Sequence, residues 1–260
     1  MSVIYSKANQ TYQTQILDYI VGSRFQNIVD IKGRVIAKEA LLKVADQEGR
    51  HVTLDCFFGQ LSELSDRFRA ASREKINLMH LVNFRYAVDY SVNQKLFINV
   101  SPLAFQFIHD RVDLLDSCIS AIHSVGMKPS QVVAEILEDH CDINTLEKFF
   151  LGVYKLRNRG VGIALDDYGV GYSNMARVAA LNPDYIKVSR ELLLKCLRSN
   201  IDCLKELMVV SRMHGTKVII EGVETDNELL FAQQNDAAGY QGFLFSKPRT
   251  LVTDDLYKTR

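Results

Sequence analysis

The chain is poor in the features that mark linkers and membrane segments. Its 260 residues contain only four prolines and no Ser/Gly-rich tract, so the sequence predicts one domain without a linker. No apolar run approaches the length of a membrane span, and the polar start at 1–14 lacks the apolar core of a signal peptide. We therefore expect no membrane insertion and a cytoplasmic location.

An excess of charge of one sign is also missing, because 31 basic residues balance 31 acidic ones. A protein dedicated to a nucleic-acid polymer or a membrane surface would need a basic excess, so we expect neither partner, although a local basic patch can still bind a phosphate. The cysteines are odd in number and lack the spacing of a metal site, which predicts reduced thiols. They are Cys56, Cys118, Cys141, Cys196 and Cys203.

Apolar strands alternate with helical segments over most of the chain. The predicted strands cover residues 95–101, 131–138, 161–166, 184–188, 217–221 and 242–245, with one helix over 102–125. Strands 25–31 and 34–42 are joined by a tight turn and must be antiparallel. Alternating strands and helices predict a parallel sheet, and a hydrophobic content of 47% suits one large α/β domain such as a closed barrel.

Two segments fit this alternation less directly. Residues 1–20 contain a short amphipathic stretch, expected to be an N-terminal extension or helix before a barrel domain over 21–260. Residues 55–90 have a helical pattern. The core-facing side chains expected there include Phe58, Leu61, Leu64 and Phe68. His80 lies among apolar residues and is predicted to be a packed core histidine rather than a ligand.

Polar residues recur where the predicted parallel strands end. They are Asn99, Glu135, Asp166, Lys187, Glu221 and Gln241. Their spacing is about that of one β/α unit, and a closed barrel would gather them at its carboxyl-terminal face. Taken alone, Glu39 fits a strand edge and Lys187 a surface strand end. The barrel instead predicts one pocket that contains them all.

Asp166 and Asp167 are adjacent, and Gly169 and Gly171 follow them. Neighbouring residues on a strand point to opposite faces, so both carboxylates can reach one site only if the backbone bends, which glycine permits. The pair alone would fit a solvated turn. The rest of the chain favours a functional site instead.

The predicted pocket is strongly acidic. Its carboxylates are Glu39, Glu135, Asp166, Asp167 and Glu221. Buried and ionised, they would repel one another, and a hard divalent cation relieves that repulsion. Carboxylates with the amide of Asn99 suit Mg²⁺ or Mn²⁺, and also Ca²⁺, whereas the lack of cysteine and histidine argues against structural zinc. Such an ion can activate water for phosphoryl chemistry, and Lys187 can hold that water, share its proton or offset phosphate charge.

Seven motifs, in order and at fitting intervals, resemble the EAL-domain family of cyclic di-GMP phosphodiesterases over roughly residues 25–250. The motifs are Glu39-Ala40-Leu41, Asn99-Val100-Ser101, Glu135-Ile136-Leu137-Glu138, Asp166 to Ser173, Asp184 to Lys187, Glu221 to Thr225 and Gln241 to Pro248. The resemblance implies a TIM-like (β/α)8 barrel with an antiparallel first strand. It also implies hydrolysis of cyclic di-GMP to linear pGpG with Mg²⁺ or Mn²⁺, and inhibition by Ca²⁺.

The resemblance also assigns roles to residues. One metal ion would be held by Glu39, Asn99, Glu135 and Asp166, and a second would be served by Asp166 and Asp167. Glu221 would be a ligand or the general base, and Lys187 would act on the nucleophilic water. Glu138 would anchor the loop at 167–173, Gln241 would support the site, and Lys43 would face the substrate phosphate.

The chain departs from the family pattern at a few positions. Lys43 replaces an arginine, Leu137 and Val170 replace threonines, Ser189 replaces an aspartate, and the segment 55–90 fits poorly. One alternative is a non-catalytic cyclic di-GMP receptor or protein-interaction module, which would be expected to have lost some of the carboxylates kept here. Another is a different TIM-barrel metalloenzyme, because the fold alone fixes no function. A homodimer through the barrel and further protein partners are compatible with each.

Overall fold

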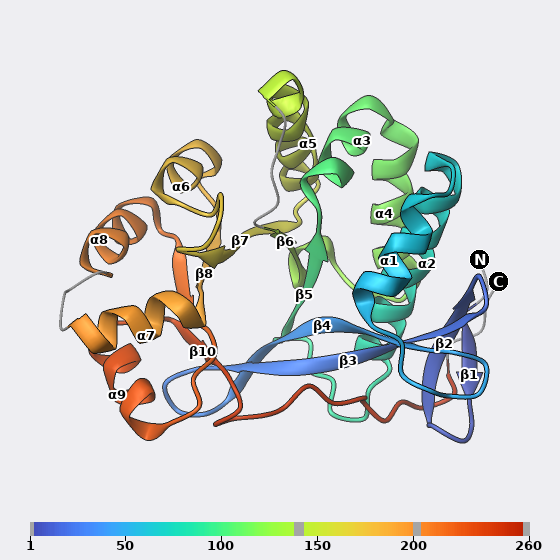
Figure 1. Cartoon of the computed structure of the whole chain (residues 1–260), viewed down its shortest axis with the longest axis horizontal. Helices are drawn as coiled ribbons and strands as arrows, with labels where there is room; N and C mark the ends of the chain where they lie inside the picture. The colour runs from blue at the N-terminus through green and yellow to red at the C-terminus, as the bar shows by residue number, and fades with distance from the viewer. Residues whose placement is uncertain (1–2, 138–142, 200–203, 257–260) are drawn as a thin grey trace.

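In a computed structural model, which describes residues 3–137, 143–199 and 204–256, the strands form one sheet that closes into a barrel (Figure 1). The strands are β1 (Ile4–Ser6), β2 (Thr11–Ile16), β3 (Tyr19–Val29), β4 (Val35–Ala45), β5 (Lys95–Val100), β6 (Val132–Ile136), β7 (Gly162–Tyr168), β8 (Tyr185–Val188), β9 (Lys217–Ile220) and β10 (Gly239–Gln241). Because β3 pairs with both β4 and β10, the strands β3 to β10 form a closed ring. The prediction of a TIM-like barrel is confirmed.

The first barrel strand, β3, is antiparallel to both of its neighbours, whereas β4 to β10 pair in parallel. Its pairing with β4 runs from Ile20 opposite Ala45 to Val29 opposite Val35. Only the ends of these strands near the connecting turn take part in the ring. The rest of β3 and β4 extends beyond it toward β2 and β1, as the two long strands in Figure 1 show.

Helices cover the outside of the barrel. They are α1 (Leu54–Ser62), α2 (Asp66–Arg85), α3 (Pro102–Asp110), α4 (Val112–Ser124), α5 (Leu146–Asn158), α6 (Met175–Leu181), α7 (Arg190–Ser199), α8 (Lys205–His214) and α9 (Asp226–Gln234). The single helix expected over 102–125 is wrong, because the extended backbone of Arg111 separates α3 from α4. None of the helices in the described ranges is long and apolar enough to cross a membrane.

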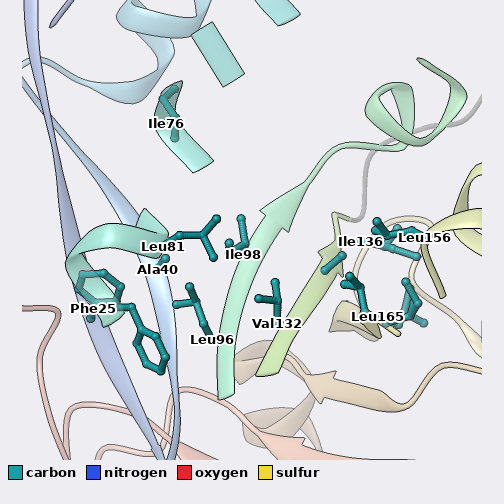
Figure 2. Close-up of a cluster of buried hydrophobic side chains, with 14 of the residues drawn as sticks. Phe25, Ala40, Ile76, Leu81, Leu96, Ile98, Val132, Ile136, Leu156 and Leu165 are labelled. Carbon is teal, nitrogen blue, oxygen red and sulfur yellow. The ribbon is translucent and has the colours of Figure 1, made fainter. Parts of the chain in front are cut away.

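Buried apolar side chains form two clusters. The larger lies between the barrel and its helices, and Figure 2 shows part of it. The smaller fills the barrel interior and consists of Ile28, Ala37, Phe97, Val133, Ala164 and Ile219. Side chains two residues apart on a strand share a face. On each parallel strand, the residue two positions after a member of the interior cluster therefore also points into the barrel, nearer its carboxyl end. Five polar residues of the predicted pocket occupy these positions.

The N-terminal segment forms strands, so the helical alternative for residues 1–20 is wrong. β2 alternates between buried and exposed side chains and pairs with β3. Asn83 of α2 fixes it further, accepting a hydrogen bond from the Tyr12 backbone at 2.8 Å and donating one to the Tyr12 carbonyl at 2.8 Å. These pairings outweigh the weak helical periodicity, and the boundary at residue 20 stays a prediction.

The helical prediction for 55–90 is confirmed, but two of its core positions are wrong. Phe58 is 43% exposed and Phe68 is 40% exposed. The segment divides into α1 and α2, so one continuous apolar face does not exist. Leu61 is buried as predicted, and so is His80, whose Nδ1 lies 2.8 Å from the hydroxyl of Ser23.

The last strand also differs from the prediction. A strand was expected over 242–245, but β10 ends at Gln241 and the following residues turn, with the Phe245 amide donating to the Gly242 carbonyl at 3.1 Å. Phe243 is 54% exposed in this turn. A short apolar run does not distinguish a strand from a turn that packs on the barrel rim.

Candidate active site

The barrel gathers the predicted polar residues at the carboxyl ends of its strands. Glu39 lies on β4, Asn99 on β5, Glu135 on β6, Asp166 on β7, Lys187 on β8 and Gln241 on β10, and Glu221 directly follows β9. Five of them stand two positions beyond a member of the interior cluster, as with Phe97 before Asn99. Lys187 stands two positions beyond Tyr185, which packs against that cluster, and Gln241 stands two beyond Gly239, which faces Ile28 and Ile219. Regular pleating therefore aims them all into the same mouth of the barrel.

Lys187 lies at the centre of this group. Its Nζ is 2.6 Å from Glu221 Oε1, 2.7 Å from Glu135 Oε1, 3.1 Å from Asp166 Oδ1 and 3.2 Å from Glu39 Oε2. The Lys187 side chain is only 1% exposed. The surface strand-end alternative is wrong for Lys187, and the strand-edge alternative is wrong for Glu39, which is 7% exposed.

Two side-chain amides hold Glu39 in place. Asn99 Nδ2 donates to Glu39 Oε1 at 3.1 Å, and Gln241 Nε2 donates to Glu39 Oε2 at 2.5 Å. Gln241 Nε2 also donates to the Oε1 of Gln26 at 3.2 Å. Both carboxylate oxygens of Glu39 therefore have donors, which keeps it ionised despite its burial.

One ammonium cannot compensate four buried carboxylates, and their pKa values diverge. Burial would raise the pKa of Glu39, but Lys187 and the two amides hold it below its usual value. Burial raises the pKa of Glu221 to about 8 and that of Glu135 well above its usual value. Neighbouring carboxylates raise both pKa values further, whereas Lys187 lowers them. The pKa of Asp166 rises for the same reasons. At neutral pH without metal, this site therefore holds protons.

Burial alone would lower the pKa of Lys187, but the facing carboxylates outweigh it and raise that pKa well above its usual value. The side chain is therefore a fixed cation at physiological pH. It serves as a hydrogen-bond donor, and it stabilises ionised oxygen atoms around it.

The bend expected at Asp166 and Asp167 is present. The pairing of β7 with β8 shifts register between Leu165 and Tyr168, and Asp167 itself has a φ of 46°, in the left-handed region that aspartate tolerates. The loop closes where the Ser173 hydroxyl donates to the Asp166 carbonyl at 2.5 Å. Asp167 is half-buried beside the buried Asp166 carboxylate.

The structure does not bring every predicted residue to the centre. Lys43 is exposed and pairs with Gly22 on the part of β4 that extends beyond the ring. It lies on the same strand face as Glu39, two pleats further along. Ser189 is buried, and its hydroxyl accepts from the Leu192 amide at 3.2 Å at the start of α7. Glu138 lies outside the described residues.

Two residues of the site escaped the sequence analysis. Gln26 lies on β3 and accepts a hydrogen bond from Gln241. Because β3 is antiparallel to its neighbours, Gln26 comes two residues before the interior residue Ile28, whereas on the parallel strands the site residue comes two residues after. Arg190 donates to the carbonyl of Gly222, directly after Glu221, and its Nη2 lies 2.9 Å from Glu224 Oε2. Arg190 therefore fixes the backbone that carries Glu221, and only the structure brings these segments together.

The donor set fits a divalent metal. Carboxylates and one amide offer the hard oxygen ligands of Mg²⁺, Mn²⁺ or Ca²⁺, and Glu135 Oε2 is buried without a hydrogen-bond partner. The carboxylates converge on Lys187 Nζ, and within the described ranges no three acidic, histidine or cysteine side chains are already grouped as a metal site. Binding of a metal ion would therefore require the Lys187 ammonium to shift.

A closed barrel with a lysine-centred acidic pocket at its carboxyl end defines a protein of the TIM-like class with an acidic site suited to cations. Comparison with known families is more specific. The model of the EAL domain matches residues 11–248, and the chain belongs to that family.

Curated relatives carry the domain within longer proteins. The chain is 28% identical over 234 residues to the probable cyclic di-GMP phosphodiesterase PdeI of Escherichia coli, covering 86% of this chain and 28% of PdeI. It is 31% identical over 144 residues to the cyclic di-GMP phosphodiesterase NbdA of Pseudomonas aeruginosa, covering 55% of this chain and 18% of NbdA. The chain thus spans less than a third of either relative.

Solved structures share the fold. The PaMucR phosphodiesterase in complex with cyclic di-GMP superposes with a TM-score of 0.73 at 21% identity, covering 88% of this chain and 92% of that one. The Klebsiella pneumoniae BlrP1 complex with manganese and cyclic di-GMP gives 0.73 at 23% identity, covering 95% and 58%. The Bacillus subtilis YkuI protein, with cyclic di-GMP and calcium, gives 0.75 at 21% identity, covering 90% and 57%.

Proposed function

We propose that this chain is a metal-dependent phosphodiesterase that hydrolyses cyclic di-GMP to linear pGpG. The observation that carries the proposal is the convergence of four carboxylates on one buried lysine at the mouth of an EAL-family barrel. Related structures that contain cyclic di-GMP with manganese or calcium support both the ligand and the use of a divalent ion. A cytoplasmic location is part of the proposal.

Metal binding would use the residues that now surround the lysine. Glu39, Asn99, Glu135 and Asp166 would hold one ion, with Asp167 and Asp166 serving a second. The ion, either Mg²⁺ or Mn²⁺, would supply Lewis acidity toward the phosphoryl group and lower the pKa of bound water. Ca²⁺ prefers longer and more numerous bonds, so we expect it to occupy the site and inhibit.

The chain's own residues would orient the reactants. Lys187 stays protonated and would donate hydrogen bonds that orient the attacking water or stabilise charge that develops on the phosphate. Glu221 would be either a ligand or the general base, with Arg190 fixing its backbone. Gln241 would keep Glu39 ionised through its hydrogen bond. Glu138 and Lys43 keep their predicted roles, in the loop at 167–173 and at the phosphate.

The test compares two Glu→Gln variants that change the same chemical group. Glu135→Gln should lower Mn²⁺-dependent formation of pGpG by about a hundredfold or more, since an amide cannot replace a bridging or charged ligand. Glu147→Gln, at an exposed position on α5, should leave the rate unchanged. Equal rates for wild type and Glu135→Gln would overturn the assignment.

The second candidate is a receptor that binds cyclic di-GMP without hydrolysing it. Lys187 at the centre of the carboxylates favours it, because the ammonium occupies the position on which the carboxylates converge and where a metal ion would bind. Binding without turnover, measured at millimolar Mg²⁺ and Mn²⁺, would identify this function. Binding measured in Ca²⁺ should survive Glu135→Gln within about tenfold in either case, because base stacking and phosphate contacts elsewhere contribute.

A further inference from the structure

A cavity of about 470 Å³ lies outside the barrel, between β5, β6 and the helices α2, α3 and α4. Its apolar wall includes Ile76, Leu81, Ile98, Val132, Phe107 and Ile122. Figure 2 shows Leu81 of α2 beside Ile98 of β5 in this layer. Ile98 belongs to the outer apolar cluster, whereas its neighbour Phe97 points into the barrel. Most of the cavity and the acidic site therefore lie on opposite faces of β5, and Asn99 borders both.

Small side chains keep this space open. Ala70 of α2, Ala104 of α3, Ala121 of α4 and Ala134 of β6 all face it. The volume is within the range of sites for small ligands, and the cavity is partly open to solvent, so a small molecule can enter it.

The lining indicates the chemistry of that occupant. Among the described residues that line the cavity, only Arg73 and Glu74 are charged, and the two charges are of opposite sign. The Arg73 guanidinium donates to the hydroxyl of Ser101 at 3.1 Å. An ionised ligand would lose its hydration without meeting an excess of opposite charge. We propose that this cavity binds an uncharged, largely apolar small molecule.

Position links the cavity to the acidic site. β5 contributes Ile98, Asn99 and Val100 to its wall, and the Asn99 side chain donates to Glu39 inside the barrel. An occupant that moves β5 by a fraction of an ångström would move Asn99. A molecule bound in the cavity should change the affinity of the site for Mn²⁺ about fivefold or more, and Mn²⁺ should change the affinity of the cavity for that molecule by the same factor. This expectation rests on the proposed metal function.

Two probes that differ in one group test the ligand class. N-phenyl-1-naphthylamine is uncharged, and 8-anilinonaphthalene-1-sulfonate has the same rings with an added sulfonate. Titrated into the full chain in EDTA, the uncharged probe should bind saturably, and the sulfonate about tenfold or more weakly. Tighter binding of the sulfonate, or no saturable binding of the uncharged probe, would overturn the proposal. Neither result depends on metal or hydrolysis.

Two measurements locate the binding. Ala104→Trp fills the cavity and should weaken the uncharged probe about tenfold or more, whereas Ala71→Trp, exposed on α2, should not. Burial raises the pKa of the cavity thiol Cys118 to about 11, so its reaction is followed at pH 9 with methyl methanethiosulfonate. In wild type, the probe should slow labelling of Cys118 and leave labelling of the exposed Cys56 unchanged. Unchanged labelling of Cys118 at saturating probe would overturn the site. An Mn²⁺ affinity that is equal with and without probe would overturn the coupling.

Discussion

Lys187 shows how much one side chain controls at the centre of this site. Its ammonium contacts four carboxylates at 2.6 to 3.2 Å and is almost fully buried. Removing one partner of a buried ion pair costs far more than the pair contributes, because the remaining charges lose both water and counter-ion. Here four buried carboxyl groups would remain without that counter-charge. The lysine is thus a structural counter-ion at the centre of the site, and the proposed function gives it a second role at the substrate.

We therefore expect Lys187→Met to destabilise the metal-free protein by about 3–5 kcal/mol. Thermal melts in EDTA measure this, and millimolar Mn²⁺ should raise the melting temperature of Lys187→Met more than that of wild type, since the ion supplies the missing charge. Lys148→Met provides the control, because Lys148 is 49% exposed in a surface pair with Asp110. Equal melting temperatures for the two variants in EDTA would contradict this role.

His80 determines part of the response to acid. It is fully buried, and burial lowers its pKa to about 4. In the unfolded chain its pKa returns to about 6.5, so the unfolded state gains a proton first as the pH falls. The stability that this residue contributes is present above pH 6.5 and is lost as the pH falls through about 4.

His80→Gln should remove this dependence. Between about pH 6.5 and 4 the free energy of unfolding of the wild type should fall by on the order of 3 kcal/mol more than that of the variant. Urea denaturation across this range gives the comparison. His123→Gln, on the exposed side of α4, is the matched control and should follow the wild type. Parallel curves for wild type and His80→Gln would show that the histidine does not titrate with unfolding.

At the scale of elements, the close contact of α3 with α5 depends on one glycine. A Cβ on Gly152 would stand 1.9 Å from the carbonyl oxygen of Phe105, far inside any real contact. Gly59 of α1 has no atom within 4 Å of the same position. The two helical glycines thus differ only in what faces them, which makes them a matched pair.

Gly152→Ala should destabilise the protein by about 1–3 kcal/mol, because the two helices must move apart. Gly59→Ala should instead stabilise it by about 0.5–1 kcal/mol through the better helix propensity of alanine. Chemical denaturation of both variants measures the difference. A stabilised Gly152→Ala variant would mean that α3 and α5 do not pack as described.

The strand periodicity made the parallel half of this site predictable. Each parallel strand carries one inward polar residue near its end, as at Glu135 and Asp166, so spacing along the sequence was enough to gather them. Gln26 could not be found this way because β3 runs in the opposite direction. Phe58 and Phe68 share one helical face only if a single helix runs through both. They belong to α1 and α2, and helix periodicity does not predict the break between these helices.

At the scale of the whole molecule, the barrel converts separate strand ends into one acidic mouth. The inner apolar layer stays below it, and the α2–α4 cavity lies outside the same wall. The chain spans only part of the relatives it matches. The proposed hydrolysis requires the carboxylates to bind a metal ion where the Lys187 ammonium now lies.

The proposed hydrolysis is tested most directly by the formation of pGpG from cyclic di-GMP by the purified chain, followed chromatographically in millimolar Mn²⁺ and in EDTA. We expect linear pGpG to accumulate with Mn²⁺ or Mg²⁺, EDTA to stop its formation, and added Ca²⁺ to inhibit it. Intact cyclic di-GMP after prolonged incubation with bound ligand and saturating Mn²⁺ and Mg²⁺ would contradict the proposed hydrolysis.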